Sequence, residues 1–304
     1  MSASIARARL ANLADITRFT NSLYGALYTL LGAYLADGTA ALGRSESWGA
    51  ALVVAIVIAY GFVINDYRDV REDSFGKAHR PIPSGRISRD AALRLAWALA
   101  ALALLVALPL GPTMLLFALG TTALATLYSF GLKGTVLLGN ASMATLIAAI
   151  PLYGALASGA VPPVIWIVAG LMWLFDFSHE ILKTTADWQA DAAAGLHTVA
   201  TVFGVEGALR IFQATALAVL AVAWLPWAVG QAPLIYLLAL VPCAILPTLA
   251  VVVVLARNSS DATIARALRI MRYMWISNLL PIVLLGKKSG VRSQKCAKRL
   301  RSLI

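Results

Sequence analysis

The sequence predicts an all-α, polytopic membrane protein with about nine transmembrane helices. Of its 304 residues, 60% are hydrophobic and only 13% are charged, and the mean hydropathy is +0.80. A soluble domain carries about 25% charged residues, so this composition argues against one or two soluble domains. The apolar residues also fall in runs of about 20, the length of a helix that crosses the hydrocarbon core.

The predicted helices are apolar runs that end at prolines, glycines or charged residues. Such boundaries include LPLGPTM, between the third and fourth runs, and ASGAVPPV, between the fifth and sixth. In chain order, we predict helices over residues 19–36, 48–64, 91–110, 112–132, 135–157, 162–179, 207–228, 232–256 and 267–286. They form one transmembrane domain over residues 18–286, between an N-terminal segment over residues 1–17 and a basic tail over residues 287–304.

Basic residues distinguish the two sides of the predicted membrane domain. Lys and Arg gather in the loops after the second, fourth, sixth and eighth runs, and the other loops contain few of them. Because basic loops stay on the cytoplasmic side, we place the N-terminus and these loops in the cytoplasm. We expect an integral, multi-pass protein of a bacterial inner membrane. The tail conflicts with nine spans, since its seven basic residues would then lie outside.

The formal charge of +11 does not by itself indicate nucleic-acid binding. Basic loops of a membrane protein attract anionic lipid headgroups, so we expect membrane lipid as a partner and no nucleic acid. The two cysteines, Cys243 and Cys296, provide neither a disulfide framework nor the spacing of a metal site.

Eight of the 14 acidic residues form two clusters at the ends of predicted helices. Ionisable groups at membrane depth are costly, so such clusters indicate function. Both clusters end even-numbered helices and therefore lie at the same face of the membrane. Spacings of three and four residues place carboxylates on one helical face in each cluster. The first cluster holds Asp66, Asp69, Glu72 and Asp73, and the second holds Asp176, Glu180, Asp187 and Asp191.

Two matched carboxylate clusters on one face indicate a cation site. Carboxylates this close repel one another unless cations neutralise them, and hard oxygen ligands suit Mg²⁺, which proteins share with substrate phosphates. Basic side chains near the clusters would form charge-assisted hydrogen bonds with phosphate oxygens. They are Lys77, Arg80, Lys133 and Lys183. One acidic helix end alone would more simply be a solvated loop or an ion pair.

The acidic segments resemble the motifs of the UbiA superfamily of intramembrane prenyltransferases. NDYRDVRED fits that family's N-D-x-x-D-x-x-x-D motif, and KAHRPIPSGRIS is similar to its R-P-I-P-S-G continuation. EILKTTADWQADAAAGLHTVATVFG resembles the second, D-x-x-x-D motif, and LYSFGLKGTVLLGN resembles the segment after the fourth helix. The resemblance covers about residues 18–285. In one departure, Thr184 stands where many members have the first Asp of the second motif.

The resemblance implies a bundle of about nine transmembrane helices around a central cavity that holds a metal–diphosphate site. Its Mg²⁺ ligands would be Asp66, Asp69, Asp73, Asp187 and Asp191. Its catalytic residues would be Asn65, Asp66, Asp69, Asp187 and Tyr128. Its substrate-binding residues would be Lys77, Arg80, Lys133, Lys183, Arg18, Asn21 and Asn140. Aromatic cavity walls would stabilise an allylic cation, and further candidates for that wall are Trp97, Tyr153, Trp166, Trp173 and Phe175.

These features predict a Mg²⁺-dependent enzyme that transfers an isoprenyl group from a prenyl diphosphate to an acceptor within the membrane. We expect an aromatic acceptor, with a glyceryl-phosphate lipid as the alternative. A terpene cyclase, in which the substrate's own double bonds quench the cation, is a second alternative. A cation-coupled transporter is a third, but transporters usually bind near the bilayer midplane, whereas both clusters lie at predicted helix ends.

Overall fold

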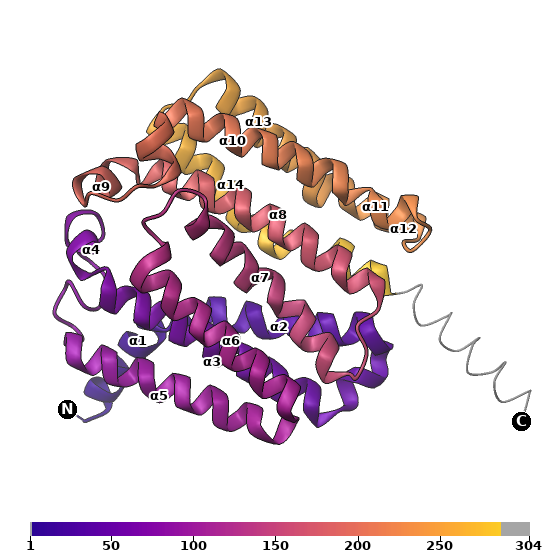
Figure 1. Ribbon diagram of the computed structural model, residues 1–304, viewed down its shortest axis with the longest axis horizontal. Helices are drawn as coiled ribbons and strands as arrows, with labels where there is room; N and C mark the ends of the chain where they lie inside the picture. The colour runs from indigo at the N-terminus through magenta and orange to yellow at the C-terminus, as the bar shows by residue number, and fades with distance from the viewer. Residues whose placement is uncertain (1, 287–304) are drawn as a thin grey trace, which may run out of the picture.

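Helices form all the regular structure in residues 2–286, which are the residues that the computed structural model describes (Figure 1). The α-helices are α1 (Ser2–Ile16), α2 (Phe19–Asp37), α3 (Ser45–Arg68), α4 (Val70–Gly76), α5 (Arg89–Ala107), α6 (Pro112–Leu127), α7 (Leu138–Ala157), α8 (Pro163–Ala186), α9 (Trp188–Ala193), α10 (Val199–Ala223), α11 (Leu225–Ala228), α12 (Leu234–Leu240), α13 (Leu246–Arg257) and α14 (Asp261–Ser277). Short 3₁₀ segments are η1 (Gly38–Gly43) and η2 (Leu108–Leu110), and π-helical segments are η3 (Tyr128–Leu132) and η4 (Val241–Ile245).

Eight helical spans of the described residues are long and apolar enough to cross a membrane. They begin with α3, α5, α6, α7, α8, α10, α12 and α14, and several continue through the short segments that follow. The prediction of an all-α, multi-pass membrane protein is therefore confirmed.

A ninth helix, α2, brings the described residues to the predicted number of membrane-length helices. Its 19 residues suffice for a crossing, but Thr20, Asn21 and Ser22 make its first turn polar. α2 contacts both α3 and α7, and it buries Tyr28 and Leu35 among them. Burial against its neighbours thus compensates for a sequence that is less apolar than the other spans.

Several helices, among them α8, α10 and α14, extend past an end of the predicted run, because an apolar run ends at charged residues although the helix does not. α8 continues past residue 179 and carries Asp176 and Glu180 as buried side chains. α10 starts at Val199 and kinks at Gly204, whose φ is 70°, and α14 starts at Asp261. Much of the second acidic cluster therefore lies on a membrane-spanning helix, facing protein.

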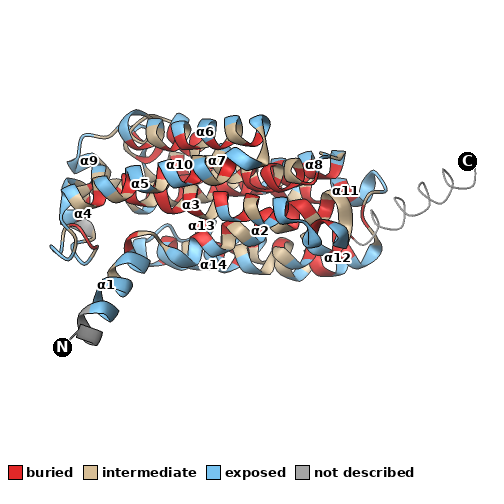
Figure 2. Cartoon of the chain, turned by 90° about the horizontal axis from the view of Figure 1, so that it is seen from below, coloured by how far each residue is buried: buried red, intermediate tan, exposed pale blue. Residues whose placement is uncertain are grey.

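The loops after α3, α6, α8 and α13 lie at one end of the bundle (Figure 1). We call it the α4–α9 end, because α4 and α9 contact each other there. α1 is at the same end and projects away from the bundle (Figure 2), whereas the described chain finishes at the opposite end. Entry and exit at opposite ends require an odd number of crossings, in agreement with nine. The basic tail, 287–304, lies outside the described residues, so its side of the membrane stays a prediction.

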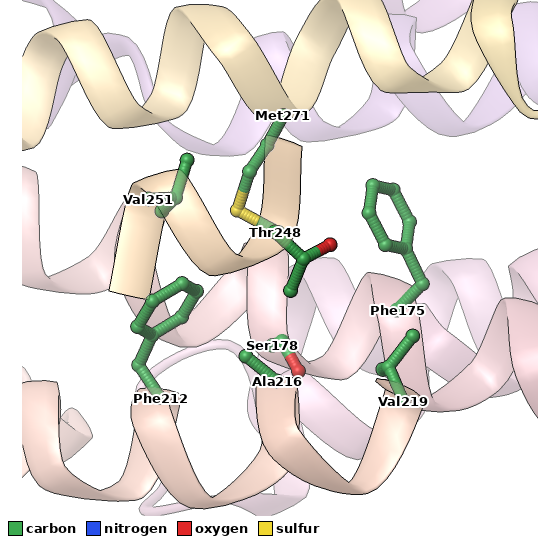
Figure 3. A pocket seen from close by; sticks show the side chains of 8 residues that line it. All are labelled: Phe175, Ser178, Phe212, Ala216, Val219, Thr248, Val251 and Met271. Carbon is green, nitrogen blue, oxygen red and sulfur yellow. The ribbon is translucent and has the colours of Figure 1, made fainter. Parts of the chain in front are cut away.

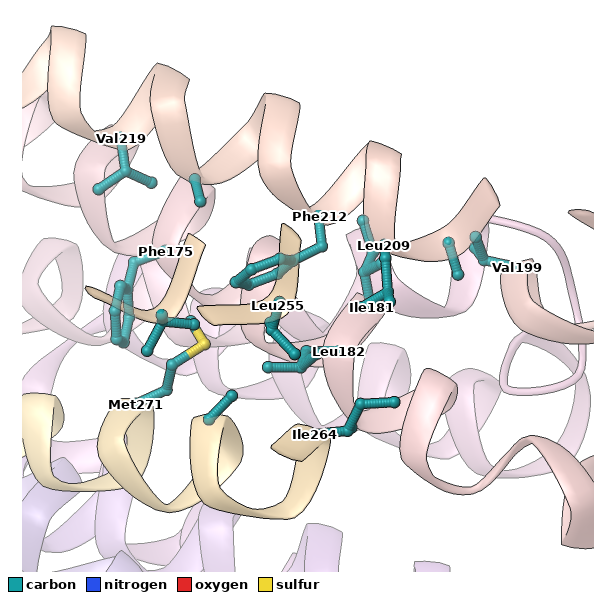
Figure 4. Close-up of a cluster of buried hydrophobic side chains, with 14 of the residues drawn as sticks. Phe175, Ile181, Leu182, Val199, Leu209, Phe212, Val219, Leu255, Ile264 and Met271 are labelled. Carbon is teal, nitrogen blue, oxygen red and sulfur yellow. The ribbon is translucent and has the colours of Figure 1, made fainter. Parts of the chain in front are cut away.

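Apolar side chains cover the outer surface of the bundle as well as its interior. Leu105, Leu116 and Leu238 are 65%, 67% and 68% exposed, as expected for side chains that contact lipid rather than water. Figure 2 shows the buried residues between the helices. One buried cluster joins α8, α10, α13 and α14 and includes Phe175 and Phe212 (Figure 4).

A cavity of about 10 Å³ lies within this cluster (Figure 3). Phe212, Thr248 and Met271 are among the side chains that line it. A space of this size holds about one water molecule, so it is too small for an isoprenoid.

The aromatic residues predicted for a cavity wall have other surroundings. Trp97 and Trp166 are 54% and 61% exposed, so they are not part of the buried core, and their role in a cavity wall stays a prediction. Phe175 packs edge-on against Trp275, with ring centroids 5.0 Å apart, which makes it part of the contact between α8 and α14. Tyr153 is buried, and its hydroxyl donates a hydrogen bond to the Met114 carbonyl at 3.1 Å. Trp173 stacks on Phe177 at 4.8 Å.

Candidate active site

The first acidic cluster forms where α3 ends. Asp69 has a φ of −85° and a ψ of 12° and separates α3 from α4. The Asp69 amide donates to the Asn65 carbonyl at 2.9 Å, and the Asp73 amide donates to the Asp69 carbonyl at 2.8 Å. Helical spacing therefore continues across the break, and Asp66, Asp69 and Asp73 are only 2%, 4% and 5% exposed. Buried carboxylates at this density require compensating cations.

Two arginines neutralise Asp66 and Asp73. Arg80 Nη1 lies 3.2 Å from an Asp66 oxygen and 2.6 Å from an Asp73 oxygen. Arg18 Nη2 lies 3.0 Å from the other Asp66 oxygen. Arg18 adopts a φ of 48° between α1 and α2, a left-handed conformation that costs a non-glycine residue about 1–2 kcal/mol. The ion pair with a buried carboxylate helps to offset that cost.

Lys133 neutralises Asp69 through an ion pair with its Oδ2 atom. The π-helical turn η3 precedes Lys133, and the Lys133 amide donates to the Tyr128 carbonyl at 3.0 Å, five residues back. Such turns shift the register of the following residues and are frequent at functional sites. Tyr128 itself is half-buried and lies within electrostatic range of Asp69 and Lys183.

The second acidic motif begins at the end of α8 and meets the first. Asp187 separates α8 from α9, and the Asp191 amide donates to the Asp187 carbonyl at 2.9 Å. Lys77 Nζ, from the loop after α4, lies 3.0 Å from Asp187 Oδ2. Burial and the neighbouring Asp187 raise the pKa of Asp191 to about 6. The two motifs, 110 residues apart at this ion pair, thus form one site, which we call the clamp.

Lys183 and the side chains of three predicted asparagines make no hydrogen bond or ion pair with the clamp in the described part of the chain. Lys183 Nζ donates to both oxygens of Glu180, at 2.9 and 3.1 Å. Asn65 is half-buried, Asn21 is exposed and Asn140 is buried. None of these asparagines makes a side-chain hydrogen bond within residues 2–286, so their predicted roles stay predictions.

Sequence spacing did not reveal two contributions to the site. The contact of Arg18 with Asp66 depends on a backbone conformation for which the sequence has no signal. Arg86 donates to Asp15 at 2.6 Å and to Asn12 at 3.0 Å, which ties α1 to the loop after α4. The basic residues of RPIPSGR show that the loop is charged, but they do not identify its partner.

The donor set of the clamp fits Mg²⁺. All five predicted metal ligands are carboxylates. Three of them, Asp66, Asp69 and Asp73, are buried, and Asp66 and Asp73 share the counter-ion Arg80. Hard oxygen ligands of this kind, with substrate phosphates completing the coordination, are those that Mg²⁺ prefers. The residues present are thus compatible with a Mg²⁺–diphosphate site.

Comparison with known proteins agrees with this architecture. The sequence matches the profile of the UbiA prenyltransferase family over residues 26–279. The chain belongs to this family. It is 33% identical over 266 residues to a digeranylgeranylglyceryl phosphate synthase of Methanopyrus kandleri, covering 88% of this chain and 96% of the relative. A protein of the same name in Methanoregula boonei is 37% identical over 213 residues, covering 68% and 74%. This UbiA-family chain is accordingly a prenyltransferase, as the motifs predicted.

Solved structures of UbiA-family proteins have the same fold. A digeranylgeranylglyceryl phosphate synthase in membranes superposes with a TM-score of 0.73 at 23% identity, covering 92% of this chain and 99% of the other. A UbiA homologue from Archaeoglobus fulgidus, bound to GPP and Mg²⁺, superposes with a TM-score of 0.67 at 20% identity, covering 89% and 99%. The predicted UbiA-like helical fold is therefore confirmed.

Proposed function

We propose that this prenyltransferase uses Mg²⁺ and transfers an isoprenyl group from a prenyl diphosphate to a glyceryl-phosphate lipid. The donor and the metal are supported by the Archaeoglobus fulgidus homologue bound to GPP and Mg²⁺. The acceptor is supported by the names of the Methanopyrus and Methanoregula relatives. The predicted aromatic acceptor gains no support from these relatives and becomes the alternative. The prediction of a bacterial membrane likewise gains none, since these relatives are archaeal.

The observation that carries this proposal is the ion pair of Lys77 with Asp187, which joins the two acidic motifs at 3.0 Å. A Mg²⁺–diphosphate contains both signs of charge, so its site needs carboxylates and cations side by side. Two ion pairs of the clamp, Asp69–Lys133 and Asp187–Lys77, show this arrangement. In each pair the aspartate is a predicted metal ligand and the lysine is a predicted diphosphate ligand. The alternation of charges therefore matches the substrate better than it matches a simple cation.

Substrate binding then requires these side chains to exchange partners. Asp69 and Asp187 would release Lys133 and Lys77, whose ammonium groups would donate to phosphate oxygens. When bound, Mg²⁺ supplies positive charge that stabilises the departing diphosphate. Because each exchange keeps charges paired, metal and diphosphate should bind with positive cooperativity, and each should raise the affinity for the other equally.

The placement of the clamp disfavours transport and suggests an orientation. Asp69 and Asp187 lie at the ends of α3 and α8, whereas coupling ions of transporters bind near the bilayer midplane. The α4–α9 end carries the basic loops, so we place it in the cytoplasm. Donor and metal would then reach the site from the aqueous side and the isoprenoid tail would extend between the helices.

Product analysis tests the acceptor. The purified protein in nanodiscs would receive labelled geranylgeranyl diphosphate and Mg²⁺, with geranylgeranylglyceryl phosphate, with a hydroxybenzoate, or with no acceptor. We expect a new ether lipid only in the first reaction, detected by mass spectrometry. A prenylated aromatic product would restore the aromatic acceptor, and a cyclic product without acceptor would identify a cyclase.

Metal removal tests the cofactor separately from the acceptor. With EDTA in excess, we expect product formation to stop, because the clamp carboxylates lose the cation that links them to diphosphate, and we expect Mg²⁺ to restore it. The measurement is the initial rate of diphosphate release. Full turnover in chelator would contradict the proposed Mg²⁺ site.

A further inference from the structure

A second group of ionisable side chains lies deeper on α8 than the clamp. Asp176, His179 and Glu180 are spaced by three and four residues, so they occupy one helical face. Their ligand-capable atoms all lie within 4.8 Å of one another. Asp176 precedes Asp187 by eleven residues, or about 16 Å along a helix, and Glu180 precedes it by about 10 Å. The group is therefore separate from the clamp.

The hydrogen bonds of this group are incomplete. Asp176 is 4% exposed, and its Oδ2 atom has no hydrogen-bond partner within the described part of the chain. His179 Nδ1 is also buried without such a partner, and it lies 3.9 Å from Asp176 Oδ1. Buried polar atoms are nearly always paired, and an unpaired buried carboxylate oxygen is costly. Asp176 Oδ2 and His179 Nδ1 therefore keep unused hydrogen-bonding or ligating capacity on one helical face, which a cation between the two side chains would use.

The charge balance of the group points the same way. Lys183 binds both oxygens of Glu180 and so balances one of the two carboxylates. Lys133 and Arg272 also act on the group, but Lys133 is already paired with Asp69 and Arg272 is exposed, where its charge is screened. Asp176 is left without a direct counter-ion.

We propose that Asp176, His179 and Glu180 form a second divalent-cation site within the membrane domain. One imidazole and two carboxylates suit a borderline first-row ion such as Mn²⁺, Fe²⁺ or Zn²⁺, because imidazole favours transition metals over Mg²⁺. Ligand atoms that share such an ion at about 2.1 Å each lie about 3–3.5 Å apart, so the side chains must close by about 1 Å. Side-chain rotation on a helix provides a movement of that size.

Occupation of this site would affect Lys183. Glu180 holds Lys183 in the structure, so coordination of Glu180 to an ion would free the Lys183 ammonium to turn toward the clamp. Lys183 would thus link the two sites. An ion bound at the second site would make the Lys183 ammonium available to a diphosphate in the clamp.

The imidazole gives the proposal a spectroscopic test that does not depend on activity. The five predicted ligands of the clamp are carboxylates, so Mn²⁺ bound there has oxygen ligands, whereas Mn²⁺ at the second site has His179 nitrogen. Pulsed EPR of the purified protein titrated with Mn²⁺ detects nitrogen coordination directly. We expect a ¹⁴N coupling in the parent protein. His179→Gln should lose this coupling and should bind one Mn²⁺ fewer per chain than the parent. Asp187→Asn should keep the coupling.

Matched variants complete the test. His79→Gln and His197→Gln remove the other two histidines of the sequence and should keep the coupling. Asp176→Ala removes a ligand and adds no nitrogen, and it should also abolish the coupling, which provides a second readout if His179→Gln fails to fold. Absence of ¹⁴N coupling in the parent at saturating Mn²⁺, or its persistence in either folded variant, His179→Gln or Asp176→Ala, would overturn the proposal. Protons or an acceptor hydroxyl would then balance Asp176.

Discussion

Asp69 and Asp187 are the residues whose removal tests the clamp most directly, because they belong to different motifs. If both hold one diphosphate through metal, Asp69→Ala and Asp187→Ala should each lower the turnover rate by about two to three orders of magnitude, since one lost electrostatic contact at a transition state costs about 3–4 kcal/mol. The double variant should be little slower than either single variant, because groups that act as a unit are non-additive. The measurement is the initial rate at saturating Mg²⁺.

A matched control for these substitutions is Asp261→Ala. Asp261 is exposed in the first turn of α14, at the same end of the bundle, and it belongs to no predicted site. Its removal should leave the rate unchanged. If Asp187→Ala kept more than about a tenth of the parent rate, a loss well below that estimate, the second motif would not share the diphosphate, and the clamp would consist of the first motif alone.

Thr184 provides the opposite substitution. Its hydroxyl donates to the Ile181 carbonyl of its own helix at 2.9 Å, so it is not a ligand of the clamp. Thr184→Asp places a carboxylate three residues before Asp187, where many family members have one. We expect activity to be kept and the Mg²⁺ concentration for half-maximal rate to fall, as measured by titration. A loss of activity above about tenfold would show that the departure has changed the site itself.

At the residue scale, the sequence predicted the carboxylates of the clamp better than their partners. Spacing within NDYRDVRED suffices to place Asp66, Asp69 and Asp73 together, because helical periodicity is local. The pairing of Lys77 with Asp187 joins residues 110 positions apart, and no local rule specifies it. Lys183 shows the consequence, since its motif placed it with the diphosphate ligands and the structure pairs it with Glu180.

At the scale of elements, the close crossing of α2 and α7 depends on glycine. A Cβ atom at Gly154 would overlap the Thr29 carbonyl, and one at Gly32 would overlap the backbone of Pro151. Gly154→Ala should therefore destabilise the protein by about 3 kcal/mol, at the upper end for overpacking, although alanine is the better helix former. The measurement is a fall in Tm of several degrees in detergent.

The control for that substitution is Gly170→Ala. Gly170 is an exposed glycine of α8 and would place its Cβ in open space, so alanine should keep or raise the Tm through helix propensity alone. Equal Tm values for the two variants would mean that α2 and α7 separate without cost. Apolar runs predicted that both helices exist, but the distance between them depends on atoms that no run length encodes.

The π-helical turn η3 is an element that periodicity does not predict. LYSFGLK continues the apolar pattern of α6, and one extra residue in the turn changes where Lys133 points without changing composition. The end of α8 is a related case, because Asp176 and Glu180 interrupt the apolar run while facing protein. Sequence patterns therefore predicted the number of long helices. They did not predict the helix ends and the helical register at the segments that carry the functional side chains.

At the scale of the molecule, the clamp brings together side chains from α3, α4, the loop after α6 and the α8–α9 junction. Folding must therefore complete most of the bundle before Lys133 meets Asp69 or Lys77 meets Asp187. The same condition explains why both motifs lie at one end. Helices that alternate in direction return every second loop to the same face, and the basic residues of those loops become the counter-ions of the clamp.

Cysteine labelling tests this shared face. In a Cys243→Ser, Cys296→Ser background, Ser74→Cys and Ser259→Cys introduce thiols at exposed positions of the α4–α9 end, and Ser45→Cys introduces one at the start of α3, at the other end. Because the α4–α9 end carries the basic loops, an impermeant maleimide should label Ser74→Cys and Ser259→Cys only after the membrane of intact cells is permeabilised, and Ser45→Cys without permeabilisation. Labelling of both α4–α9 variants in intact cells would invert the orientation. Labelling of only one would place α3 and α13 in opposite directions, which contradicts the bundle itself.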